Sequence, residues 1–163
     1  MNDIIAAIDF SENNEGVLDK AAEIAKALGA KLWIVHATSI GNAAPIVALE
    51  SYEYYGILQQ YSQSAIDIEY DRKLTVDRFK HEHGALKALS AKFKEDGIDC
   101  TGLLLEGKPA EVILNKAADI DAGLIVLGSH GHGELHKLFL GSTSKAILDG
   151  AKCGVLIMPS SKG

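Results

Sequence analysis

The chain has 163 residues, of which 47% are hydrophobic and 23% charged, and its formal net charge is −6 at pH 7. This length and composition are typical of one globular domain, covering residues 1–163, with enough apolar residues for a full core. The negative charge argues against nucleic-acid or anionic-membrane binding, and no apolar run is long enough to cross a bilayer.

The first part of the chain alternates between strand and helix patterns. Residues 4–8 read as an apolar strand, and residues 14–28 place apolar side chains on one helical face before Gly29, a common helix stop. Residues 31–37 predict a second strand. A strand, a helix and a strand at this spacing predict a parallel crossover unit of right-handed sense.

Residues 40–62 interrupt this alternation as a variable excursion. They contain four of the five tyrosines, namely Tyr52, Tyr54, Tyr55 and Tyr61. The excursion is interpreted as a lid over a ligand site or as part of a subunit interface. A loop whose tyrosines pack on the domain is the alternative.

The rest of the chain returns to alternating helices and strands. The predicted helices cover residues 64–95, 110–120 and a segment from Ser142, and the predicted strands cover residues 98–105, 124–127 and 155–158. Pro109 lies in the first turn of the second of these helices. The order β-α-β-α-β-α-β-α-β predicts an α/β protein in which helices cover both faces of a parallel sheet.

The N-terminal segment and the cysteines both favour a cytoplasmic location. No basic segment precedes an apolar one after Met1, so a secretory signal peptide is not expected. Cys100 and Cys153 are the only cysteines and have no metal-binding or redox spacing. We therefore expect both thiols to be reduced and structural.

The segment after the fourth predicted strand carries the strongest functional signal. It contains Gly128, Gly131 and Gly141, and Ser142 and Thr143 open the helix that follows. Glycines let the backbone approach a ligand closely, and a helix N-terminus presents unpaired N–H groups and the positive end of its dipole. We expect a phosphate site for a nucleotide, with turn glycines and a plain N-cap as the alternative.

Two common nucleotide motifs are excluded at this segment. Gly128 and Gly133 have the G-x4-G spacing of a P-loop, but Glu134 stands where lysine is required and would repel phosphate. The fingerprint for dinucleotides fails because His136 replaces its third glycine and because the segment follows the fourth strand rather than the first. We therefore expect neither a P-loop ATPase nor NAD binding.

Over nearly its whole length, the chain resembles the universal stress protein family. That family carries the pattern G-x2-G-x9-G-S/T after its fourth strand, which Gly128, Gly131, Gly141 and Ser142 match. Further matches are Asp9-Phe10-Ser11, Val35-His36-Ala37, Gly107 with Pro109, and residues 154–159. The resemblance implies a doubly wound open sheet of order 3-2-1-4-5, similar to the adenine nucleotide alpha hydrolases. It also implies ATP binding and homodimers formed along the fifth strand.

In a sheet of this order the ligand lies where the strand order reverses, between the first and fourth strands. We expect the backbone N–H groups around Gly128, Gly131, Gly141 and Ser142 to bind phosphate oxygens. The hydroxyl groups of Ser142 and Thr143 add further donors at the helix start.

The resemblance assigns the other half of the site to the adenosine. Asp9 would repel a phosphate, so it is expected to contact adenine or ribose, or to hold a metal ion such as Mg²⁺. Ala37 and Thr38 are expected to line the adenine pocket. Lys137 reaches the outer phosphates or remains a solvated surface lysine, and His130 lies along the nucleotide or on the surface.

The histidines near the glycine motif suggest an alternative metal site. His130, His132 and His136 cluster with Glu134 in sequence, and a helical turn would give two of the histidines a chelating spacing. We favour contact with the nucleotide or with solvent over a dedicated metal site.

The preferred function is an ATP-binding regulatory protein of the stress response that acts on an unidentified protein partner. Because no general base is placed near the expected phosphates, we expect the protein to retain ATP with little or no turnover. A slow ATPase or metal-dependent phosphohydrolase is one alternative. A dimeric interaction module that needs no nucleotide is the other.

Overall fold

The structure, a computed structural model, describes residues 3–11, 14–38, 65–129 and 140–159. The described strands are β1 (Ile4–Ile8), β2 (Leu32–Thr38), β3 (Cys100–Glu106), β4 (Leu124–Gly128) and β5 (Gly154–Met158). The described helices are α1 (Asn14–Leu28), α3 (Ala65–Glu95), α4 (Pro109–Asp119) and α5 (Ser142–Gly150). The excursion expected at residues 40–62 lies outside the described residues.

The five strands form one parallel sheet in the order β3-β2-β1-β4-β5. β1 lies at the centre, where Ile4 is in register with Leu32 of β2 and with Leu124 of β4. This arrangement confirms the predicted fold class and the predicted strand order. Because parallel strands all begin at the same edge of the sheet, the chain must cross back to that edge after each strand. A helix therefore follows each of the first four strands.

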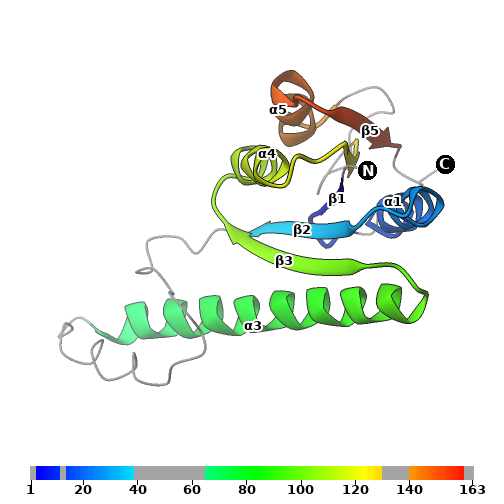
Figure 1. The fold of residues 1–163 in the computed structure, drawn as a ribbon. Coiled ribbons are helices and arrows are strands. Elements are labelled where there is room, and N and C mark those ends of the chain that lie inside the picture. The colour runs from blue at the N-terminus through cyan, green and yellow to red at the C-terminus, as the bar shows by residue number, and fades with distance from the viewer. Residues whose placement is uncertain (1–2, 12–13, 39–64, 130–139, 160–163) are drawn as a thin grey trace.

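Helices cover both faces of the sheet, as predicted. Because successive side chains of a strand point to opposite faces, β1 contributes to two separate cores. Ile4 packs on one face with residues such as Leu86 of α3, and Ile5 packs on the other face with residues such as Ile147 of α5. Figure 1 shows α3 alongside β3, with α4 and α5 on the other side of the sheet.

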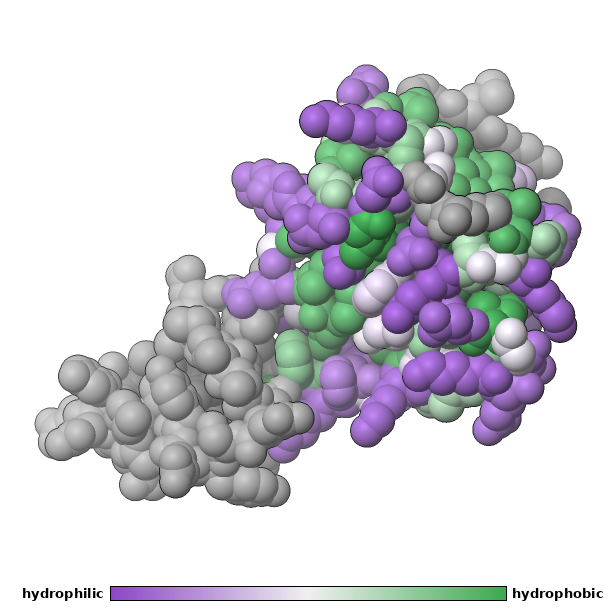
Figure 2. All heavy atoms as spheres, viewed as in Figure 1, coloured by the Kyte–Doolittle hydropathy of each residue, from purple (hydrophilic) through white to green (hydrophobic). Residues whose placement is uncertain are grey.

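The described surface carries both hydrophilic and apolar residues (Figure 2). In the view of Figure 2, hydrophilic residues are spread over the described surface, with apolar residues showing between them. The large apolar side chains most exposed among the described residues are Phe10, Leu28, Leu74 and Leu148. No helix in the described part of the chain is both long enough and apolar enough to span a membrane.

β3 begins two residues later than the sequence pattern suggests. The helix α3 is closed by Gly97, whose φ is +80°, and the N–H of Ile98 donates to the carbonyl of Phe93. Ile98 therefore belongs to the end of the helix rather than to the sheet. The carbonyl of Asp99 then accepts the N–H of Leu32, and Cys100 is the first residue of the strand.

The long helix α3 approaches β3 closely at a glycine. A Cβ atom built on Gly102 would lie 2.7 Å from the backbone oxygen of Leu86, a residue that is 1% exposed. Any side chain at residue 102 would therefore push α3 away from the sheet. The contact determines how close to the sheet the residues of α3 lie.

The two cysteines lie near opposite edges of the sheet and are both free. Cys100 begins edge strand β3, and Cys153 directly precedes edge strand β5. Burial is the largest cause that raises the pKa of the Cys100 thiol to about 11, and burial also raises the pKa of Cys153.

The raised pKa of Cys100 predicts a protected thiol. At pH 8 about one Cys100 side chain in a thousand is the reactive thiolate in the native protein, since each pH unit below the pKa lowers that fraction about tenfold. A Cys153→Ala variant, which keeps only this thiol, should react with a chromogenic disulfide reagent very slowly when folded and rapidly in denaturant. Fast reaction of the folded variant would contradict the described burial.

The close contact at Gly102 predicts a loss of stability on Gly102→Ala. The added methyl group must displace the backbone of α3, so we expect the free energy of unfolding to fall by about 1–3 kcal/mol. Gly84→Ala is the matched control, because a Cβ atom on Gly84 of α3 meets nothing within 4 Å. That variant should gain about 0.5–1 kcal/mol from its better helix propensity. Urea unfolding measures both, and equal stability of the two variants would contradict the proposed packing.

Candidate functional site

The strand order reverses at β1, which has β2 on one side and β4 on the other. The chain leaves β1 at Asp9 and leaves β4 at Ser129, toward opposite faces of the sheet. At such a point the loops diverge and leave space beyond the carboxyl ends of the strands. The sequence analysis expects the ligand at this point of the sheet.

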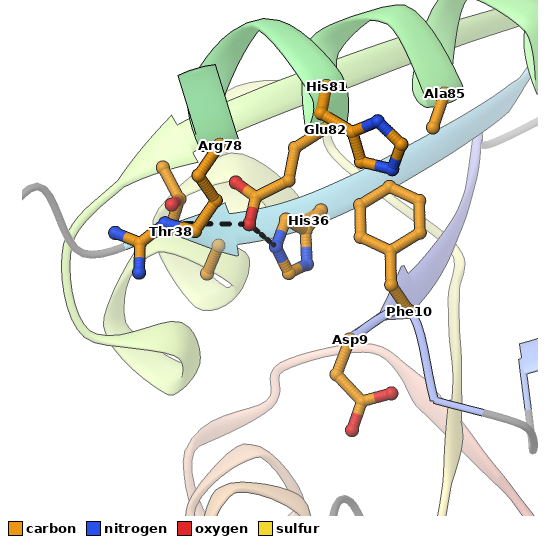
Figure 3. Close-up of a pocket in the computed structure, with 9 residues that line it drawn as sticks. Asp9, Phe10, His36, Thr38, Arg78, His81, Glu82 and Ala85 are labelled. Carbon is orange, nitrogen blue, oxygen red and sulfur yellow. Dashed lines mark ion pairs between the residues drawn. The ribbon is translucent and has the colours of Figure 1, made fainter. Parts of the chain in front are cut away.

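A pocket of about 660 Å³ lies at this edge of the sheet, a size suited to a small molecule. Its lining comes from the ends of β1 and β2 and from one face of α3 (Figure 3). The lining residues are Asp9, Phe10, His36, Ala37, Thr38, Arg78, His81, Glu82 and Ala85. Three of the residues predicted for the adenosine, Asp9, Ala37 and Thr38, thus share one pocket.

A tight turn positions the residues that follow β1. The Oδ1 atom of Asp9 accepts the N–H of Ser11 at 3.0 Å, and Oδ1 of Asn14 accepts the N–H of Asp9 at 3.3 Å. Phe10 has a φ of +58°, which is uncommon for a residue with a side chain and often marks a functional turn. The turn leaves the Phe10 ring 36% exposed beside the pocket, with its centroid 4.7 Å from that of His36.

Two hydrogen bonds to backbone carbonyl oxygens hold the end of β2 in place. His36 is buried, and its Nδ1 lies 2.9 Å from the carbonyl oxygen of Ile8. Because a carbonyl oxygen can only accept a hydrogen bond, Nδ1 of His36 carries the proton. The other ring nitrogen, Nε2, is directed toward the pocket lining, at Glu82. The carbonyl of Thr38 accepts the N–H of Gly107, whose φ of +136° suits glycine, so β2 is also tied to the turn after β3.

The helix α3 adds charged groups that the sequence analysis did not assign to the site. The Oε1 atom of Glu82 lies 3.7 Å from Nε2 of His36 and 3.9 Å from Nε of Arg78 (dashed lines in Figure 3). No local pattern separates Glu82 from the other acidic residues of this polar helix, and only its contact with β2 identifies it. His81 and His83 are exposed, and His81 also lines the pocket.

The expected phosphate half lies where β4 meets α5. The hydroxyl of Ser144 donates to the carbonyl of Gly128 at 2.8 Å, and the N–H of Ser129 donates to Met158 of β5. The first bond attaches the start of α5 to the end of β4, and the second attaches that end to β5. Ser142 and Thr143 are the first residues of α5, and no side chain caps this helix at Gly141 within the described residues.

Gly141 is engaged differently from what the sequence suggests. Its N–H donates to the carbonyl of Ser129 at 2.8 Å and closes the loop between β4 and α5. Its backbone therefore helps to place the helix N-terminus, and an N–H bond to phosphate at Gly141 would require this bond to break. The N–H groups of Ser142 and Thr143, one and two residues further on, begin the first turn.

Several predicted residues lie outside the described part of the chain. They are His130, Gly131, Lys137 and the neighbouring His132, Glu134 and His136. Their expected contacts with phosphate, and the alternative metal site, stay predictions. Over residues 3–11, 14–38, 65–129 and 140–159, no group of three or more histidine, cysteine or acidic side chains is arranged to hold a metal ion.

Known proteins resemble this chain over its whole length. The universal stress protein in the QAH/OAS sulfhydrylase 3' region of Thermus aquaticus is 32% identical over 155 residues, covering 95% of this chain and 96% of that protein.

Solved structures share the fold. The universal stress protein from Archaeoglobus fulgidus in complex with dAMP has a TM-score of 0.61 at 19% identity, with 96% of this chain and 97% of that chain covered. A universal stress protein family protein from Arabidopsis thaliana with AMP bound has a TM-score of 0.62 at 18% identity, with 99% and 94% covered. The model of the universal stress protein family matches residues 1–159, and the chain therefore belongs to that family.

Proposed function

We propose that this protein is a cytoplasmic, ATP-binding regulator of a stress response that retains its nucleotide with little or no turnover. The observation that carries the proposal is the pocket of about 660 Å³ at the carboxyl ends of β1 and β2, next to the point where the strand order reverses. The adenosine occupies the pocket and the phosphates extend toward α5.

The order of the strands gives the nucleotide its direction. Thr38 at the end of β2 and Gly128 at the end of β4 are separated by β1, so the two strand ends are about 10 Å apart, or two strand spacings. That span suits a ligand with its base at one end and its phosphates at the other. The Ser142 and Thr143 hydroxyls and the positive end of the α5 dipole favour the phosphates at β4.

Relatives with bound nucleotides support the choice of ligand. The proteins of the same fold from Archaeoglobus fulgidus and Arabidopsis thaliana carry dAMP and AMP. Both ligands contain adenine on a pentose with one phosphate. The glycine pattern of Gly128, Gly131, Gly141 and Ser142 extends the proposal to ATP.

The described groups near α5 favour retention over hydrolysis. Lys145 and Asp149 pair with each other at 2.9 Å on the exposed side of this helix, and the hydroxyl of Ser144 is already used by Gly128. Oδ1 of Asp9 accepts the N–H of Ser11. The other carboxylate oxygen of Asp9 remains as a hard ligand suited to Mg²⁺. Mg²⁺ at Asp9 would neutralise charge between the carboxylate and the nucleotide phosphates.

Filling the pocket should abolish nucleotide binding. Ala85→Trp places a large ring in the space proposed for the adenosine, so the affinity for ATP with Mg²⁺ in calorimetry should fall by about tenfold or more. Ala88→Trp, on the exposed side of the same helix, is the matched control and should bind as the wild type does. Absence of binding to the wild-type protein at sub-millimolar ATP would refute the proposal. Sustained release of phosphate would refute the retention of ATP.

The free edge of β5 supports a homodimer. β5 lies at one edge of the sheet with its apolar side chains half-buried, and an unpaired edge of this kind readily adds another strand. Pairing with the same strand of a second copy around a two-fold axis satisfies both edges. Light scattering after size exclusion at micromolar concentration should give twice the 17.4 kDa mass of one chain. A single-chain mass would contradict this assembly.

A further inference from the structure

Glu82 carries one of the two buried side-chain polar atoms that have no hydrogen-bond partner among the described residues, the other being Oγ of Ser11. The side chain of Glu82 is 15% exposed, and its Oε2 atom is buried without a hydrogen-bond partner among the described residues. The nitrogen atoms Nε2 of His36 and Nε of Arg78 lie 3.7 and 3.9 Å from Oε1, which is longer than a hydrogen bond. A buried acceptor without partners destabilises a fold, so such a group usually has a ligand, a water or an ion to bind.

The neighbouring side chains are not placed to satisfy this carboxylate. The Nδ1 atom of His36 is committed to the carbonyl of Ile8, which holds the ring where it is and leaves Nε2 at 3.7 Å. Arg78 lies one helical turn away on α3, with a side chain that is 54% exposed. These contacts leave the carboxylate at the pocket lining without completing its hydrogen bonds.

We propose that Glu82 selects the base of the bound nucleotide by accepting a hydrogen bond from the 6-amino group of adenine. This inference rests on the proposed nucleotide function. A carboxylate can only accept, and the 6-amino group is the donor that adenine presents on its base edge. Rotation about the last bond of the glutamate side chain, a soft torsion, can turn either oxygen toward the base.

The charges around the pocket place the base, rather than a phosphate, next to Glu82. Asp9 and Glu82 are both carboxylates that line the pocket, so a phosphate placed beside Glu82 without a bound cation would be repelled. In Figure 3 the Asp9 carboxylate points away from Glu82, on the other side of the His36 and Phe10 rings. The exposed Phe10 ring offers an aromatic surface against which a base can pack.

The test compares two nucleotides that differ only at the 6-position. AMP carries the amino group, whereas purine riboside 5′-monophosphate has a hydrogen atom there. The wild-type protein should bind AMP about tenfold or more tightly in calorimetry, since a hydrogen bond to a charged acceptor supplies at least this factor. In Glu82→Ala and Glu82→Met the two affinities should become equal. Glu95→Ala, an exposed glutamate of the same helix, should keep the wild-type ratio.

The affinity ratio separates base selection from a structural role. If Glu82 only shapes the pocket, its variants will weaken both nucleotides alike and keep the ratio, which would overturn the proposal. Equal binding of both nucleotides by the wild-type protein would overturn it while leaving the nucleotide function intact. No binding of AMP would overturn both.

Two further outcomes test how Glu82 acts. Glu82→Met retains the volume of the side chain. If circular dichroism shows that both Glu82 variants lose the folded state, the carboxylate is needed for folding, and its role in selecting the base would be refuted. In another outcome, the wild-type protein would bind AMP and dAMP with different affinities, the Glu82 variants would bind them equally, and the affinity ratio of AMP to purine riboside 5′-monophosphate would stay unchanged. Glu82 would then contact a ribose hydroxyl instead of the base. That result would also overturn the proposal.

Discussion

The central strand β1 pairs with β2 on one side and with β4 on the other, and the location of the site depends on this reversal of strand order. Because the chain crosses to a different face of the sheet after β1 than after β4, the segments that follow these two strands separate. A crevice remains between them at the carboxyl edge. Asp9 and Ser129, which are far apart in sequence, thereby follow neighbouring strand ends.

The two halves of this crevice differ in their chemistry. The part beside β2 is lined by acidic, histidine and aromatic side chains, including Asp9, Glu82 and Phe10. The part beside β4 ends in glycine and in the hydroxyl-bearing first turn of α5, attached through Ser144 to the carbonyl of Gly128. For a protein with a net charge of −6, local helix-dipole and hydroxyl groups are a more suitable phosphate site than a basic surface.

The packing of α3 connects fold stability with the site. Gly102 allows the backbone of α3 to lie against β3, and one turn further toward the helix N-terminus Glu82 reaches His36 at the end of β2. The buried Oε2 of Glu82 opposes folding, whereas the packing of Leu86 directly beside it favours folding. Unfavourable groups of this kind persist in proteins where neighbouring contacts compensate for them, most often at functional sites.

The amino-acid sequence by itself determined the alternation of strands and helices, because apolar spacing and glycine or proline stops are local features of the chain. Helix α1 has the bounds that its pattern predicts, and the resemblance of the glycine motif to a family correctly supplied the strand order. The contact between Glu82 and His36, the hydrogen bond of the Gly141 N–H and the late start of β3 were decided only by the tertiary structure. Each depends on hydrogen bonds or packing between segments distant in sequence, or on how a helix end closes, and neither composition nor periodicity records such contacts.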